Sequence, residues 1–153
     1  MSKDEVKKRR LRWWHGCLIA FGLFVLGILT IIILTFAATR VAAQTAENFL
    51  LELSAGTEIG EVYEVYVADI FKEATSLEQF SRYVDNNPIL TDVQSVSFYS
   101  REIVDYGAEG KYTVLIGSMF GTEETADIEF ELFEVGDNEW EISYLMVNPL
   151  LDQ

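Results

Sequence analysis

The chain has 153 residues, with 25 acidic residues against 11 Lys and Arg, and its formal net charge is −14. So acidic a chain is a poor binder of nucleic acid or of anionic lipid, because both carry negative charge. It contains a single cysteine, so an internal disulfide is excluded and the folded part must rely on its own hydrophobic core.

An uncharged run, residues 16–39, follows a basic N-terminal segment, residues 1–15. A helix of this length spans about 36 Å, which is enough to cross a hydrocarbon core of about 30 Å. Lys and Arg cluster before the run, whereas Arg40 is the nearest basic residue after it. The length of the run predicts a transmembrane helix at 16–39. The positive-inside rule then places the N-terminus in the cytoplasm and residues 40–153 outside.

Two alternatives concern the same run. A cleaved signal peptide is one, because Val41-Ala42-Ala43 offers small residues for cleavage after Ala43. The run is longer than the apolar region of a signal peptide, which favours an uncleaved signal-anchor.

Cys17 is either an ordinary membrane-helix residue or a site of lipidation. The absence of glycosylation sequons and of cysteine pairs beyond residue 40 favours a bacterial plasma membrane.

The outer part, residues 40–153, is expected to be one acidic domain that begins with three helices. Residues 40–54 have one apolar face and should continue, or closely follow, the membrane helix. Residues 57–74 keep a helical period after a possible Thr57 cap, although the segment VYEVYV also suits a strand. Ser76 and Gln79 form a capping box that opens a third helix, which ends before Pro88. The residues expected to face inward in this third helix are Leu77, Phe80 and Val84.

After Pro88 the apolar period changes to two, which predicts four strands in an antiparallel meander. The fold class is therefore expected to be α+β, with one N-terminal transmembrane helix and then three helices packed on a curved four-stranded sheet. On the first strand, the residues expected on the apolar face are Val96 and Phe98. On the third strand they are Ile128, Phe130 and Leu132, and on the fourth strand Trp140, Ile142, Tyr144 and Met146.

The segments FLLEL, DIFKEATSLEQF and EWEISYL occur in an order that resembles the nuclear-transport-factor-2-like superfamily of cone-shaped domains. The nearest resemblance is to small bacterial membrane-anchored members of unknown function, and it covers residues 44–149. The positions that carry it are Val62, Tyr63, Phe71, Lys72, Ser76, Glu78, Phe80, Trp140 and Ile142. The resemblance implies a concave pocket between the helices and the sheet. The residues it suggests as pocket-lining are Tyr63, Tyr66, Asp69, Tyr99 and Trp140.

The outer domain carries no recognisable catalytic, cofactor-binding or metal-binding motif. It has neither His nor Cys, so zinc and iron sites are not expected. Asp137-Asn138-Glu139 lacks the alternating ligand loop that calcium requires. The serines of the first two strands have no histidine to activate them as nucleophiles. We therefore predict no catalytic residues, no cofactor and no metal.

The predicted function is a non-catalytic protein-interaction or assembly module of an envelope complex, anchored in the lipid bilayer through residues 16–39. The first alternative is a cone that binds a small hydrophobic ligand, and the second is an enzyme of isomerase or hydratase type. A cone filled by aromatic side chains argues against both alternatives. An open apolar cavity with a buried carboxylate would favour them. The acidic surface serves either solubility or recruitment of a basic partner or cation.

The predicted topology can be tested by cysteine labelling. In a Cys17→Ser background, a single cysteine placed near Gly136 should react with a membrane-impermeant reagent added to intact cells. Reaction only after cell lysis would show that the domain lies inside and would reverse the predicted orientation.

Overall fold

The computed structural model describes residues 3–137 and 139–149, and within them the side chains from residue 18 onward except that of residue 109. Asn138 of the expected turn at 135–139, and the side chains of the basic segment 1–15, lie outside this description. The chain divides into two compact units, Met1–Ala37 and Ala38–Gln153.

The first unit is helix α1, Lys3–Ala38. Its part from Leu18 to Ala38 has a mean hydropathy of 2.8 and buries none of its residues against the protein. The hydroxyls of Thr30 and Thr35 donate to backbone carbonyls one turn earlier, at 2.9 and 3.0 Å, so both polar groups are satisfied within the helix. The structure thus contains one N-terminal helix that is long and apolar enough to span a membrane, as expected.

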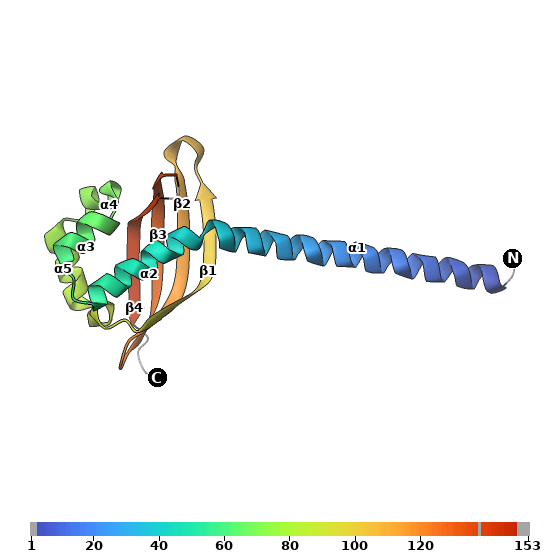
Figure 1. The fold of residues 1–153 in the computed structure, drawn as a ribbon, viewed down its shortest axis with the longest axis horizontal. Coiled ribbons are helices and arrows are strands. Elements are labelled where there is room, and N and C mark those ends of the chain that lie inside the picture. Colours follow the sequence, from blue (N-terminus) through green and yellow to red (C-terminus); the bar gives the residue numbers. More distant parts are fainter. Residues whose placement is uncertain (1–2, 138, 150–153) are drawn as a thin grey trace. The chain divides into compact units, whose positions relative to one another are not determined.

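The second unit is an α+β domain in which helices precede a 4-stranded antiparallel sheet with the order β1-β2-β3-β4. The sheet is an open meander, so the expected fold class is confirmed. In Figure 1, α2 crosses the sheet, and α3, α4 and α5 gather at the β4 side. The elements are α2 (Arg40–Ser54), α3 (Ile59–Tyr66), α4 (Asp69–Ala74), α5 (Leu77–Asn86), the 3-10 helices η1 (Pro88–Thr91) and η2 (Gly107–Glu109), β1 (Ser95–Asp105), β2 (Lys111–Phe120), β3 (Thr125–Gly136) and β4 (Glu139–Pro149).

Aromatic side chains fill the space between the helices and the sheet. The ring of Phe49 on α2 lies 5.9 Å from Phe130 on β3, 6.2 Å from Phe80 on α5 and 6.1 Å from Tyr66 on α3, measured between ring centroids. Phe49, Phe80 and Phe130 are at most 1% exposed. Edge-to-face and tilted contacts of this kind suit the aromatic quadrupole. The space between the helices and the sheet is therefore packed with protein side chains.

The expected helix at 57–74 is wrong, because the structure has two short helices there. Val67 is extended, with φ −100° and ψ 127°, and forms a parallel bridge with Ile142 of β4. The amide of Ala68 donates to the carbonyl of Ile142 at 2.9 Å. The β-branched sequence suited both states, and pairing with the edge of β4 decided for an extended break. Thr57 does not cap α3, which begins at Ile59 after Glu58.

The expected third helix is confirmed as α5. Ser76 accepts a hydrogen bond from the amide of Gln79, and the side chain of Gln79 accepts one from the amide of Ser76, which completes the capping box. Phe80 and Val84 are buried as expected. Leu77 is 43% exposed, so its expected inward position is wrong. At the first helical position, its side chain lies at the rim of the packed face.

The prediction of which β4 residues face inward is correct for the first part of the strand and wrong for the second part. Trp140 and Ile142 are buried, whereas Tyr144 is 42% exposed and Met146 is half-buried. The pairing with β3 shifts by one residue here, so that Ser143 is an extra residue in a β-bulge. A one-residue bulge reverses which side chains face the core. The inward positions therefore pass to Leu145 and Val147.

A second bulge interrupts β1 at Tyr99, between the paired residues Phe98 and Ser100. Phe98 is buried and Val96 is half-buried on the inner face, as expected. Across from the bulge, a Cβ added to Gly117 of β2 would lie 2.5 Å from the carbonyl oxygen of Ser97. Glycine at this position therefore permits the close approach of the two strands.

Thr113 on β2 offers a test of this packing. Its side chain is fully buried, and within the described part of the chain its hydroxyl has no hydrogen-bond partner. Thr113→Val should therefore raise the free energy of unfolding by about 1–2 kcal/mol, because it removes an unsatisfied buried polar group. Urea unfolding of the full chain in detergent micelles measures this. The control Thr125→Val, at a half-buried strand end, should change stability little, and destabilisation by Thr113→Val would contradict the packing described.

Candidate functional site

Two of the residues suggested as pocket-lining, Tyr66 and Trp140, line one surface pocket of about 350 Å³. We call it the Trp140 pocket. It lies where α2, α3 and the hairpin between β3 and β4 meet. Its lining residues are Thr45, Val65, Tyr66, Val135, Glu139, Trp140 and Glu141.

A β-bulge at the end of β3 shapes this pocket. Glu134 pairs with Trp140 and Gly136 pairs with Glu139, so Val135 is the extra residue between them. The Val135 side chain is 45% exposed and joins the pocket wall. Bulges redirect side chains in this way at the ends of sheets. The α3 side contributes Val65, which is 59% exposed, so the two apolar walls are open to solvent.

Tyr66 is held by a hydrogen bond that its hydroxyl donates to Glu52 Oε1 at 2.7 Å. Burial, this hydrogen bond and the Glu52 charge together raise the pKa of Tyr66 from 10.0 to about 12. The phenol therefore stays neutral at physiological pH. The hydroxyl proton of Tyr66 is already used in the hydrogen bond to Glu52. Toward any further group, the Tyr66 oxygen can therefore act only as a hydrogen-bond acceptor.

Trp140 and Glu141 are the most unusual polar groups of the pocket. Trp140 is 7% exposed, and its indole nitrogen Nε1 has no partner among the described residues. Burial raises the pKa of Glu141; the charge of Lys72 opposes this shift, and the charges of Asp69 and Glu139 add to it. Trp140 thus has a buried donor without a described partner, and Glu141 has a carboxyl group whose neutral form is favoured by burial.

The other suggested residues lie outside the lining of this pocket. Asp69 is the exposed first residue of α4 and reaches the site only through its charge on Glu141. Tyr63 is buried and donates to the carbonyl of Thr75 at 2.6 Å, so it anchors α3 to the end of α4. Tyr99 is 64% exposed at the β1 bulge, and β1 is the sheet edge opposite β4.

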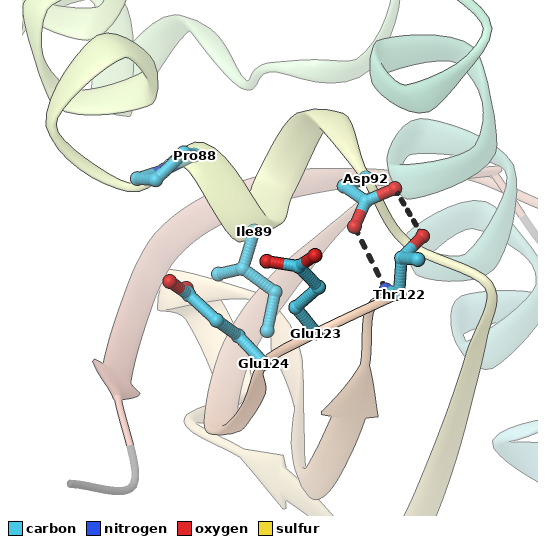
Figure 2. Close-up of a pocket in the computed structure, with 6 residues that line it drawn as sticks. All are labelled: Pro88, Ile89, Asp92, Thr122, Glu123 and Glu124. Carbon is cyan, nitrogen blue, oxygen red and sulfur yellow. Dashed lines mark hydrogen bonds between the residues drawn. The ribbon is translucent and has the colours of Figure 1, made fainter.

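A second pocket of about 350 Å³ lies between η1 and the turn that joins β2 to β3. It is lined by Pro88, Ile89, Asp92, Thr122, Glu123 and Glu124. Figure 2 shows Asp92 reaching Thr122 with both carboxylate oxygens, which accept from the amide and the hydroxyl, each at 2.8 Å. These hydrogen bonds lower the pKa of Asp92. Asp92 therefore ties η1 to the turn.

No metal centre is assembled at either pocket. Within residues 18–137 and 139–149, no three His, Cys, Asp or Glu side chains are placed to hold a metal ion. The carboxylates of the second pocket include one, Asp92, that is already bonded to Thr122.

Comparisons with protein-family models, with curated proteins and with solved structures give no match to this chain. The function is therefore argued from the geometry and chemistry of the domain itself.

Sequence reasoning singled out Tyr66 and Trp140 but missed Val135, Glu139 and Glu141. The only local signal for the two acids was their position on either side of Trp140, in the segment EWE. Strand alternation would place both acids away from the Trp140 side chain. At the edge strand and beside a bulge, both nevertheless reach the same pocket.

The Tyr66–Glu52 hydrogen bond predicts a specific alkaline behaviour. The folded-state pKa of about 12 lies above the value of 10.0 for a free tyrosine side chain. This tyrosine therefore favours folding below pH 10, and that advantage is lost as pH rises toward 12. Tyr66→Phe should make the decline of the unfolding free energy between these pH values shallower. Unfolding at several pH values measures this. The control Tyr99→Phe, on an exposed side chain, should leave the slope unchanged, and an unchanged slope in Tyr66→Phe would contradict the assignment.

Proposed function

We propose that this chain is a single-pass membrane protein whose outer domain is a non-catalytic interaction or assembly module of a bacterial envelope complex. The proposed topology has the N-terminus in the cytoplasm and residues 40–153 outside. It is supported by the exposed apolar surface of α1 and by the basic residues that precede it. A helix with so apolar an exposed surface is stable only in lipid or against another apolar surface.

One observation carries the choice of an interaction module. The interior of the cone is occupied by the rings of Phe49, Phe80 and Phe130, which contact one another directly or through Phe49. A ligand held inside the cone would have to displace these rings and lose their packing. Recognition is therefore assigned to the surface of the domain, which suits a protein partner.

The charge of the domain supports a basic partner. Beyond residue 43, the only Lys and Arg residues of the sequence are Lys72, Arg82, Arg101 and Lys111. The same part of the sequence contains every acidic residue of the chain except Asp4 and Glu5. Of these basic groups, Lys72, Arg82 and Lys111 form ion pairs with Glu64, Glu78 and Glu134. The remaining acids give the surface a negative field that attracts positively charged partners and speeds their encounter.

The resemblance to nuclear-transport-factor-2-like domains remains part of this proposal. Helices packed on one face of a four-stranded meander agree with it. A small hydrophobic ligand is the second candidate, because a groove of about 230 Å³ between α2 and the start of β1 has apolar walls. Its lining includes Leu50, Leu51, Val93 and Val96, and Leu51 is 53% exposed.

Co-purification from membranes tests the proposed function. The tagged full chain, cross-linked in intact cells and extracted in mild detergent, should recover a defined partner in constant proportion. An unrelated tagged single-pass protein at equal abundance is the control and should not recover it. Isolation of the chain as a lone monomer, with and without cross-linking, would contradict the proposal.

A further inference from the structure

We propose that the first part of β1, residues 95–98, binds an extended segment of the protein partner. The segment joins the sheet as a further strand and places an apolar side chain in the groove between α2 and β1. The inference deepens the proposed function and rests on it, since it assumes that the partner is a protein. It names the surface of contact, the conformation of the partner segment and the side chains that the segment carries.

The two edges of the sheet differ in how the domain covers them. At β4, Val67 forms a parallel bridge with Ile142, and the amide of Ala68 donates to the Ile142 carbonyl at 2.9 Å. Further along β4, the amide of Val147 donates to the hydroxyl of Tyr83 at 2.8 Å. In the described part of the chain, β2 is the only strand that pairs with β1. β1 is therefore the edge at which the sheet can accept a further strand.

The sequence at the start of β1 does not discourage such pairing. Residues 94–100 contain no charged residue and no proline, which are two of the features that protect exposed edges in other proteins. In an antiparallel pair, alternate residues direct their N–H and C=O groups to opposite sides. Alternate residues of 95–98 therefore present donors and acceptors on the side away from β2. The bulge at Tyr99 shifts the register and ends this regular stretch.

An apolar groove lies beside this stretch. Its volume is about 230 Å³, and it is bounded by α2 and the start of β1. Leu51 of α2 lines the groove and is 53% exposed. Val96 of β1 also lines it and is half-buried. A further apolar side chain placed here would cover this surface. A groove between an edge strand and a helix suits an extended peptide, because the strand supplies hydrogen bonds and the groove selects side chains.

Charge at the groove favours a basic residue in the bound segment. Glu47 is the one charged residue among the described residues that line the groove. It precedes Leu51 by four positions on α2, so the two share a helix face and the groove follows α2 over this turn. Four helical residues advance about 6 Å, and two strand residues advance about 6.6 Å. A segment with an apolar side chain at Leu51 therefore brings the side chain two positions away near Glu47, where Lys or Arg is favoured.

Two other occupants fit these features less well. A second copy of the chain would bring another strongly acidic domain to this edge, and like charges disfavour that contact. A small hydrophobic ligand would cover the walls of the groove but would form no ladder with the N–H and C=O groups of β1. An extended protein segment uses both the groove and the strand edge.

A designed peptide can take the place of the partner segment. Acetyl-TKTITKT-amide carries one apolar side chain between two lysines, each two positions away, so it presents the same pattern in either direction along β1. It is added to the isotope-labelled full chain in detergent micelles. Resonances of residues 94–98 should shift saturably. Amide exchange at alternate residues of 95–98 should slow, because a new strand protects one side of β1.

N-methylated peptides test whether the backbone pairs. One version is methylated at the Lys and Ile nitrogens, and the other at the two Thr nitrogens between them. Because alternate N–H groups of a strand point to opposite sides, one version should lose binding and the other should keep it. Equal binding of both, loss of both, or saturable shifts without slower exchange in β1 would overturn the inference. The last result would indicate a site for small apolar molecules instead.

Matched variants show whether binding occurs in this groove. Glu47→Gln should weaken binding of the lysine peptide about fivefold and leave binding of acetyl-TQTITQT-amide unchanged. Leu51→Ala should weaken binding of both peptides about fivefold. The controls are Glu73→Gln on α4 and Leu77→Ala on α5, both at exposed positions outside the groove lining, and they should leave binding unchanged. Unchanged binding in Glu47→Gln or Leu51→Ala, or equal loss in the controls, would overturn the inference. The other amide resonances show whether each variant is folded.

Co-purification separates failure of this inference from failure of the proposed function. The Glu47→Gln, Leu51→Ala double variant should recover less of the partner than the wild-type chain does. Equal recovery would leave the interaction module standing and would show that the β1 edge is not its binding site. Recovery of a second copy of the chain as the sole partner would assign the edge to self-association and overturn the inference. If the wild-type chain recovers no partner, the proposed function fails, and the inference that rests on it fails too.

Discussion

The domain depends on the packing of one ring, Phe49, against three different elements. Its contacts with Tyr66, Phe80 and Phe130 join α2 to α3, α5 and β3. Burial of such a ring is worth about 2–3 kcal/mol, and the contacts between aromatic edges add to this. No disulfide reinforces the arrangement, because the single cysteine lies at residue 17. The same ring fills the interior between the helices and the sheet.

The order of the elements and the α+β class could be predicted from sequence because both follow from local apolar periodicity. The capping box at Ser76 could be predicted for the same reason, since all its groups lie within one turn. The errors occurred where tertiary pairing decided the backbone. The bulge at Ser143 exchanged the faces of β4, and the bridge from Val67 to Ile142 divided an expected helix.

In the Trp140 pocket too, some features could be predicted from local sequence and others depend on tertiary structure. Its aromatic residues stood out in the sequence, whereas its acids were hidden among many others of the same type. What distinguishes Glu141 is its surroundings, namely burial and the neighbouring charges of Asp69 and Glu139. Those neighbours come from α4 and from the end of a hairpin that contains a bulge, so no single sequence window contains the site.

The bridge between Val67 and Ile142 has a consequence for biosynthesis. The helical half of the domain is made first, and its principal partner, β4, is the last strand of the chain. At about 5–20 residues per second, Phe49 waits about 5–20 seconds after its synthesis before Ile142 is made. During that interval the aromatic face of α2 has no sheet to cover it. Newly made chains therefore pass through a stage at which that apolar face is exposed and prone to aggregation.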